Sequence, residues 1–146
     1  MDFNNALLLG LPDTLLNRLQ VLQNAAARLT MRAPKRAHIT PTLMSLHWLP
    51  VKQRILYKVL LTVFKALHEL APSYIKDLLV AKPVSARSLR SDSQNFLLVP
   101  RSHSVTFGDR CFKNRAPLLW NQLPNRLRSC DDLNNFKCHL KTYLFK

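Results

Sequence analysis

The sequence predicts a mainly α-helical protein with about six helices around one core and a small β-hairpin in its second half. Apolar residues recur at helical spacing along most of the chain, and several of the nine prolines stand where helices would begin or end. A short apolar run, residues 96–99, is followed by an alternating stretch, residues 102–107, and the two together indicate a hairpin. Because 47% of the 146 residues are hydrophobic, we expect one core and a single domain over residues 1–146.

The first long helix is predicted over residues 12–32, after a segment, residues 1–11, that reads as the tail of a longer helix. Pro12 suits the first turn, where its missing N–H would have no helical partner. Gln20 and Asn24 lie opposite the apolar stripe of this helix. We expect the stripe to face the core, and it consists of Leu15, Leu19, Leu22, Ala26 and Leu29.

Three more helices are predicted in the first half of the chain. Thr40, as an N-cap residue, and Pro41 indicate the start of a short helix over residues 41–48. In the next helix, residues 51–70, apolar side chains cover more than half of the circumference. We therefore expect this helix to be mostly buried, with one narrow basic stripe exposed. A short helix over residues 73–79 follows.

The composition changes after the first, helical half of the chain. Residues 82–95 are rich in Ser and Arg and poor in large apolar residues, which is typical of a loop. Residues 96–99 predict a short strand that Pro100 ends, and residues 102–107 predict its hairpin partner. The single domain then has three parts, which are residues 1–80, 81–107 and 108–146.

The last part of the chain predicts two helices. The first starts near Asp109, and Pro117 must kink or restart it. A turn over residues 124–128 leads to the last helix, residues 131–144. The pair Asp131–Asp132 would lie in its first turn and complement the helix dipole. No third carboxylate is placed to complete a magnesium site, so we expect a capping role for this pair.

The charge of the chain is strongly positive. Lys and Arg total 22, Asp and Glu total 8, and the formal net charge is +14. No acidic residue occurs between Thr14 and His68. Such a surplus favours a polyanion partner, above all the phosphate backbone of RNA or DNA, since each neutralised phosphate releases a condensed counterion. A merely solvated basic face and an anionic membrane surface are the alternatives, and no stretch reaches the ~20 apolar residues of a membrane span.

The candidate nucleic-acid-binding residues form three basic groups. One group lies in the loop before the short helix, one along the helix over residues 51–70, and one beside the Ser/Arg-rich segment. We expect them to contact phosphates without reading bases, with a solvated face as the alternative for each. The groups are Lys35, Arg36 and His38; Lys52, Arg54, Lys58 and Lys65; and Arg87, Arg90 and Arg101.

The sequence offers no catalytic, metal or cofactor site, so we expect neither enzyme activity nor a small-molecule substrate. Cys111, Cys130 and Cys138 lack the close ligand pairs of zinc sites, and two glycines are too few for a phosphate-cradling loop. An odd number of cysteines suits free thiols in a reducing compartment, the nucleus or the cytoplasm. Trp48 and Trp120 lie among leucines, so core packing is expected for both, rather than stacking on unpaired bases.

A series of short motifs occurs along the chain, centred on the run LHWLPVKQRI at residues 46–55. In this order they resemble the C-terminal region of the polyproteins of non-LTR (LINE-type) retrotransposons, downstream of the reverse-transcriptase palm. The resemblance implies that the first half adjoins the thumb and that the second half is a C-terminal extension, in a region that grips template RNA or target DNA. The other motifs are residues 23–29, 38–41, 64–68, 71–74, 88–91, 99–101, 107–110 and 119–124.

The same resemblance implies that the chain is catalytically inert. Polyproteins of this family carry an endonuclease and a palm with an aromatic-x-Asp-Asp motif that holds two magnesium ions, and neither is found here. One alternative function is an interaction or self-association module, whose apolar faces would otherwise pack on the missing palm and thumb. Another is the product of a decayed element with no selected role. The candidate residues of the interaction module are Leu7, Leu8, Leu9 and Leu11.

Overall fold

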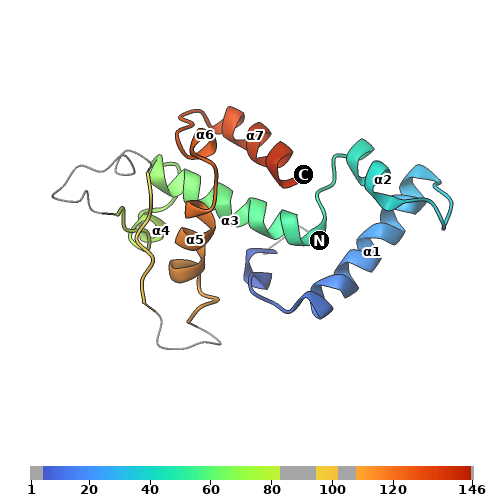
Figure 1. The fold of residues 1–146 in the computed structure, drawn as a ribbon, viewed down its shortest axis with the longest axis horizontal. Coiled ribbons are helices and arrows are strands. Elements are labelled where there is room, and N and C mark those ends of the chain that lie inside the picture. Colours follow the sequence, from blue (N-terminus) through green and yellow to red (C-terminus); the bar gives the residue numbers. More distant parts are fainter. Residues whose placement is uncertain (1–4, 83–94, 102–107, 146) are drawn as a thin grey trace.

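The structure is a computed structural model that describes residues 5–82, 95–101 and 108–145. Within these ranges the chain is mainly helical, as predicted (Figure 1). Helix α3 runs through the middle, α5 and α7 pack along it, and the α1–α2 pair lies at one end. The elements are the 3-10 helix η1 (Asn5–Leu8) and the α-helices α1 (Asp13–Met31), α2 (Ile39–Ser45), α3 (Val51–Leu67), α4 (Ser73–Lys76), α5 (Phe112–Asn121), α6 (Asn125–Arg128) and α7 (Leu133–Phe145).

The core forms around α3, and the prediction that this helix is mostly buried is confirmed. It packs against η1, α1, α4, α5 and α7, so apolar residues on several of its faces are covered. An aromatic cluster lies at the centre, where the ring of Phe64 stacks on that of Phe136 with centroids 4.1 Å apart. The fully buried ring of Trp120 lies 6.0 Å from Phe136. The buried residues of α3 are Ile55, Val59, Leu60, Val63, Phe64 and Ala66.

The predicted inward face of α1 is wrong. The buried residues of this helix are Leu16, Gln23 and Ala27, about 100° around the helix from the apolar stripe. Within that stripe, Leu22 is 56% exposed and Leu29 is 83% exposed. The helix is turned this way because its amide side chains bond to the start of α3, as described below. An apolar face of α1 is therefore left on the surface.

Three helices end at residues other than glycine in the left-handed region. These residues are Arg32 after α1, His47 after α2 and Glu69 after α3, with φ of 50°, 54° and 60°. At the end of α2, the Trp48 N–H donates to the Leu43 carbonyl at 2.8 Å, and the His47 N–H donates to the Met44 carbonyl at 2.9 Å. This pattern is a Schellman motif, in which a side chain at the left-handed position costs roughly 1 kcal/mol.

The predicted start of α2 is also displaced. The helix begins at Ile39, so Thr40 and Pro41 lie inside its first turn, and neither acts as the residue before the helix. Pro41 is tolerated there because the first-turn N–H groups have no partner within the helix. The short helix predicted over residues 73–79 is a single turn, α4, after which Leu79 is buried.

The structure shows no β-hairpin in the residues that it describes. Residues 96–99 form no strand, and a single antiparallel bridge joins Leu97 to Ala81. The side chain of Asn121 takes the place of a strand partner, since its Nδ2 donates to the Leu97 carbonyl at 2.8 Å and its Oδ1 accepts from the Leu97 N–H at 2.9 Å. The expected partner strand, residues 102–107, lies outside the described residues.

The C-terminal helices follow the prediction with four differences. Helix α5 begins at Phe112, after the expected Asp109, and continues through Pro117 as one helix. The expected turn over residues 124–128 is the single helical turn α6. The last helix begins at Leu133, and Asp132 caps it, because the Asp132 Oδ2 accepts from the Asn135 N–H at 2.9 Å. The capping role is thus confirmed for Asp132.

Candidate nucleic-acid interface

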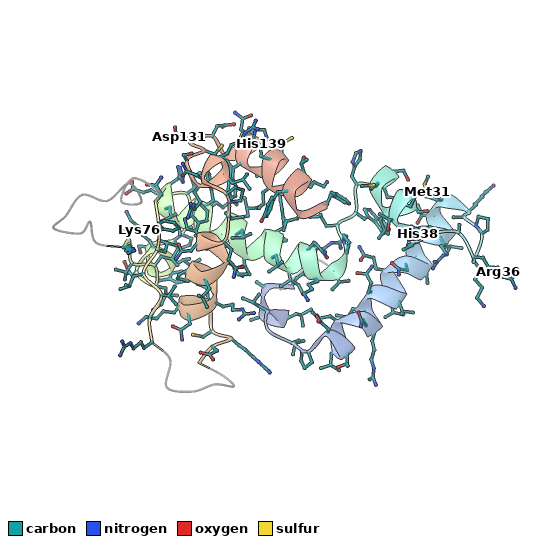
Figure 2. All side chains as sticks on the ribbon, in the orientation of Figure 1. Met31, Arg36, His38, Lys76, Asp131 and His139 are labelled. Atoms are coloured by element: carbon teal, nitrogen blue, oxygen red, sulfur yellow. The ribbon has the colours of Figure 1, made fainter. Side chains whose placement is uncertain are left out.

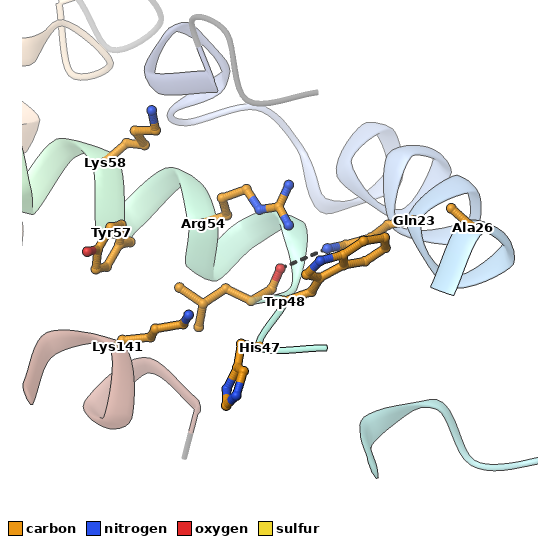
Figure 3. A pocket seen from close by; sticks show the side chains of 9 residues that line it. Gln23, Ala26, His47, Trp48, Arg54, Tyr57, Lys58 and Lys141 are labelled. Atoms are coloured by element: carbon orange, nitrogen blue, oxygen red, sulfur yellow. Dashed lines mark hydrogen bonds between the residues drawn. The ribbon is translucent and has the colours of Figure 1, made fainter. Parts of the chain in front are cut away.

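A groove lies where α1, the connection between α2 and α3, α3 itself and α7 come together (Figure 3). Its volume is about 630 Å³. Three stretches far apart in the sequence, residues 23–26, 47–58 and 141, contribute to its lining, so it exists only in the folded chain. The lining residues are Gln23 and Ala26 from α1; His47, Trp48 and Leu49 from the α2–α3 connection; Arg54, Tyr57 and Lys58 from α3; and Lys141 from α7.

Amide side chains of α1 hold one wall of this groove in place. The buried Gln23 Nε2 donates to the Leu49 carbonyl at 2.9 Å, which Figure 3 shows as a dashed line. The Gln20 Oε1 accepts from the backbone N–H of Val51, the first residue of α3, at 2.8 Å. The Gln20 Nε2 in turn donates to the Asn24 Oδ1 at 2.8 Å. The first two of these bonds satisfy the Leu49 carbonyl and the Val51 N–H, which lie at the start of α3 and have no partner within that helix.

Three cationic side chains line the groove. Arg54 and Lys58 are one turn apart on α3, which is about 6 Å along the helix axis. Lys141 enters from α7, which packs beside α3. None of the nine described lining residues is acidic. A concave surface with one sign of charge focuses the field and raises the local concentration of anions.

An aromatic surface accompanies these cations. Trp48 and Tyr57 are both partly buried and both line the groove. Burial raises the pKa of the Tyr57 phenol above its ordinary value. Flat apolar rings beside cations are the combination by which proteins hold bases and phosphates together.

The other predicted residues of the α3 group have different surroundings. The Lys52 ammonium pairs with the Asp13 carboxylate at 2.9 Å, and both side chains are well exposed. The Asp13 carboxylate offsets part of the positive charge that Lys52 presents to an external anion. Lys65 lies two turns beyond Lys58 on the same face of α3 and is partly buried, but it does not line the groove.

The structure does not bring the remaining two groups to the groove. Lys35, Arg36 and His38 are exposed in the loop between α1 and α2, at the end of the molecule farthest from α4 and α5 (Figure 2). Arg101 is exposed in the segment 95–101. Arg87 and Arg90 lie outside the described residues. The described members of the three predicted groups therefore lie on separate surfaces of the molecule.

Sequence reasoning missed Lys141 and misplaced Trp48. The core prediction is confirmed for Trp120, which is fully buried and donates from its Nε1 to the Asn95 carbonyl at 2.9 Å. It is wrong for Trp48, which lies outside the buried core and lines the groove. In the sequence, Lys141 stands out only as a residue on the polar side of the last helix. That position does not predict that α3 packs beside it.

Arg128 lies outside the groove and is buried, and its side chain packs within the protein. Its guanidinium lies 4.0 Å from the centroid of the Phe96 ring, and its Nη1 donates to the Asn121 carbonyl at 3.4 Å. Burial lowers the pKa of Arg128 from its ordinary value. The aromatic ring and the carbonyl end of α5 offset part of the cost of burying this charge.

Across residues 5–82, 95–101 and 108–145, no three His, Cys, Asp or Glu side chains gather as a metal site, and Cys111, Cys130 and Cys138 are free. Within the same ranges no helix combines the length and apolar character needed to cross a bilayer. Comparisons of the chain with protein-family models, with curated proteins and with solved structures find no match.

Proposed function

We propose that this chain binds nucleic acid through contacts with the phosphate backbone and has no catalytic activity of its own. The observation that carries the proposal is the groove, which Lys58 of α3 and Lys141 of α7 both line and in which no described lining residue is acidic. The net charge of +14 supports it, because so many like charges repel one another unless a polyanion is near. Such a role agrees with the resemblance to the region downstream of the palm in non-LTR reverse transcriptases.

The mechanism needs only positioned cations. Arg54 and Lys58 project from a helix that the core holds on several faces, so little of their backbone has to be ordered on binding. Each phosphate that a cation neutralises releases condensed counterions into bulk solution, and this release drives binding at low salt. Contacts of this kind fix the nucleic acid on the protein without selecting a base sequence.

The test is a salt titration of binding to a fluorescent single-stranded oligonucleotide, followed by anisotropy. For contacts from Lys58 and Lys141, the logarithm of the affinity should fall with the logarithm of salt concentration with a slope of about −1.4 or steeper. The variant with both Lys58→Ala and Lys141→Ala should lose about 1.4 from the magnitude of this slope. No binding at low salt, or an affinity independent of salt, would overturn the proposal.

A matched control separates the groove from general charge. The variant with both Lys35→Ala and Arg36→Ala removes the same two charges from the exposed loop between α1 and α2. It should change the affinity and the slope less than the groove variant does. Lys52→Ala should also have a small effect, because Asp13 already pairs with this lysine at 2.9 Å. Equal losses in all three variants would show that the groove is not the binding surface.

We propose self-association as a second candidate function, because α1 presents an unpartnered apolar face. Leu15, Leu22 and Leu29 are 45%, 56% and 83% exposed on it. Association through this face would strengthen with salt, which screens repulsion between the basic chains, whereas nucleic-acid binding would weaken. Sedimentation velocity tests it, and Leu22→Lys should abolish a dimer. A monomer at every protein and salt concentration would exclude this second function.

A further inference from the structure

The two tryptophans of the chain have opposite environments. Trp120 is fully buried, and its indole N–H donates to a backbone carbonyl. Trp48 is only partly buried and faces the groove, and among the described residues its indole N–H meets no acceptor. A tryptophan that serves packing alone is expected to resemble Trp120. The environment of Trp48 therefore indicates that its ring is available to contact a ligand in the groove.

The backbone holds Trp48 in a defined position. It follows His47, which has a φ of 54°, and its own N–H donates to the Leu43 carbonyl in the Schellman motif that ends α2. On its other side, the carbonyl of Leu49 accepts from the buried Gln23. The residues before and after the indole are thus both tied to helices, which fixes the position of the ring.

Cationic side chains line the same groove as this ring. In Figure 3 the Arg54 side chain extends from α3 toward the side where the indole lies, and the Lys141 side chain projects from α7. Tyr57 adds a second aromatic side chain, and Ala26 adds a small apolar one. The volume of about 630 Å³ lies within the range of ~300–1,000 Å³ that is typical of pockets that enclose small organic groups. The groove thus offers a stacking surface and positive charge around it.

We propose that the groove binds a single-stranded segment of nucleic acid, with one unpaired base stacked on Trp48 and the flanking phosphates held by Lys58 and Lys141. This inference rests on the proposed nucleic-acid binding and adds a preference for single strands. Every base has a π-face, so stacking tolerates any sequence. In a duplex the bases are already stacked on one another, and only the phosphates would be available to the groove.

Intrinsic fluorescence gives a direct test on the full chain. Oligothymidylate and oligouridylate of about 12 nucleotides are titrated in parallel arms for DNA and RNA, each beside a duplex of the same length. Single strands should quench the emission of Trp48, and the duplex should not. Because Trp120 is fully buried, it is the internal reference, and Trp48→Phe should remove the quenching while retaining a ring in the groove.

Affinity measurements separate stacking from charge. Trp48→Ala should weaken single-strand binding by about 5- to 150-fold and duplex binding by less than about 2-fold. Lys58→Ala should weaken both. Tyr74→Ala is the matched control, because it removes an exposed aromatic side chain from α4, outside the groove, and it should change neither. Far-UV circular dichroism and thermal melting establish that the Trp48 variants remain folded.

The outcomes distinguish the two proposals. Equal affinity for single strands and duplex, with no quenching, would overturn the stacking inference and leave phosphate binding intact. No binding of either nucleic acid at low salt would overturn both. Displacement of the oligonucleotide by polyglutamate of equal charge, at equal concentration, would show a purely electrostatic surface and would also overturn the stacking inference.

Discussion

The buried amide of Gln23 provides the sharpest test of how the groove is assembled. Only 3% of this residue is exposed, and its Nε2 donates to the Leu49 carbonyl at 2.9 Å. Gln23→Met keeps nearly the same length and volume but removes the donor. Leu49 is itself 6% exposed, so its carbonyl would be left without a partner in a place that water reaches poorly.

The expected cost follows from that geometry. Leaving a buried carbonyl without a donor costs about 1–3 kcal/mol, because the desolvation of the oxygen is no longer compensated. Gln23 also loses a bond as acceptor, from the Gln20 Nε2 at 3.1 Å, but this donor keeps its bond to Asn24. For a chain of this size each kcal/mol lowers the melting temperature by about 3 °C. We therefore expect Gln23→Met to melt about 3–9 °C below the wild-type protein.

Urea denaturation followed by far-UV circular dichroism measures the free energy of unfolding, and the slope with urea should stay unchanged. Asn24→Ala is the control from the same network, because its side chain is only partly buried and water can replace it, so it should cost less than about 0.5 kcal/mol. Hydrogen exchange of the α1 amides should accelerate in Gln23→Met. A melting temperature within 1 °C of wild type, with unchanged exchange and unchanged oligonucleotide affinity, would refute the role of this amide in holding the groove.

Three further predictions concern the core and the titratable groups. Phe136→Ala should lower the free energy of unfolding by about 3–5 kcal/mol in urea denaturation, since its fully buried ring stacks on Phe64; a cost below about 1 kcal/mol would contradict this packing. Arg128→Met should melt at or above the wild-type temperature, because among the described residues no carboxylate pairs with this buried cation. A melting temperature more than about 5 °C lower would show that the contact with Phe96 outweighs the cost of desolvating the guanidinium. Burial raises the pKa of Tyr57 above the value of 10.0 expected in the unfolded chain. As the pH rises above 10, the unfolded state therefore loses the phenol proton first, and the melting temperature should fall. It should fall less steeply with pH for Tyr57→Phe, and an equal dependence on pH in both proteins would contradict the raised pKa.

Local patterns were sufficient to predict several parts of the fold. The apolar side chains of α3 cover so much of its circumference that burial was the only arrangement open to it, and the structure agrees. Asp132 precedes a helix-forming run, and its cap depends on residues three positions apart. By contrast, the ends of α1, α2 and α3 use Arg32, His47 and Glu69 in the left-handed region, and without glycine at these places no local pattern marks them.

The sequence by itself determined that the chain is helical, that α3 is buried and that positive charge is in large excess, because these properties depend on composition and on spacing along one helix. Only the tertiary structure decided which face of α1 is buried, since the Leu49 carbonyl and the Val51 N–H found their partners in amides from a distant helix. The same holds for the groove, where Lys141 comes from α7. Hydrogen bonds and packing between distant segments depend on three-dimensional proximity, which the spacing of residues within one helix does not contain.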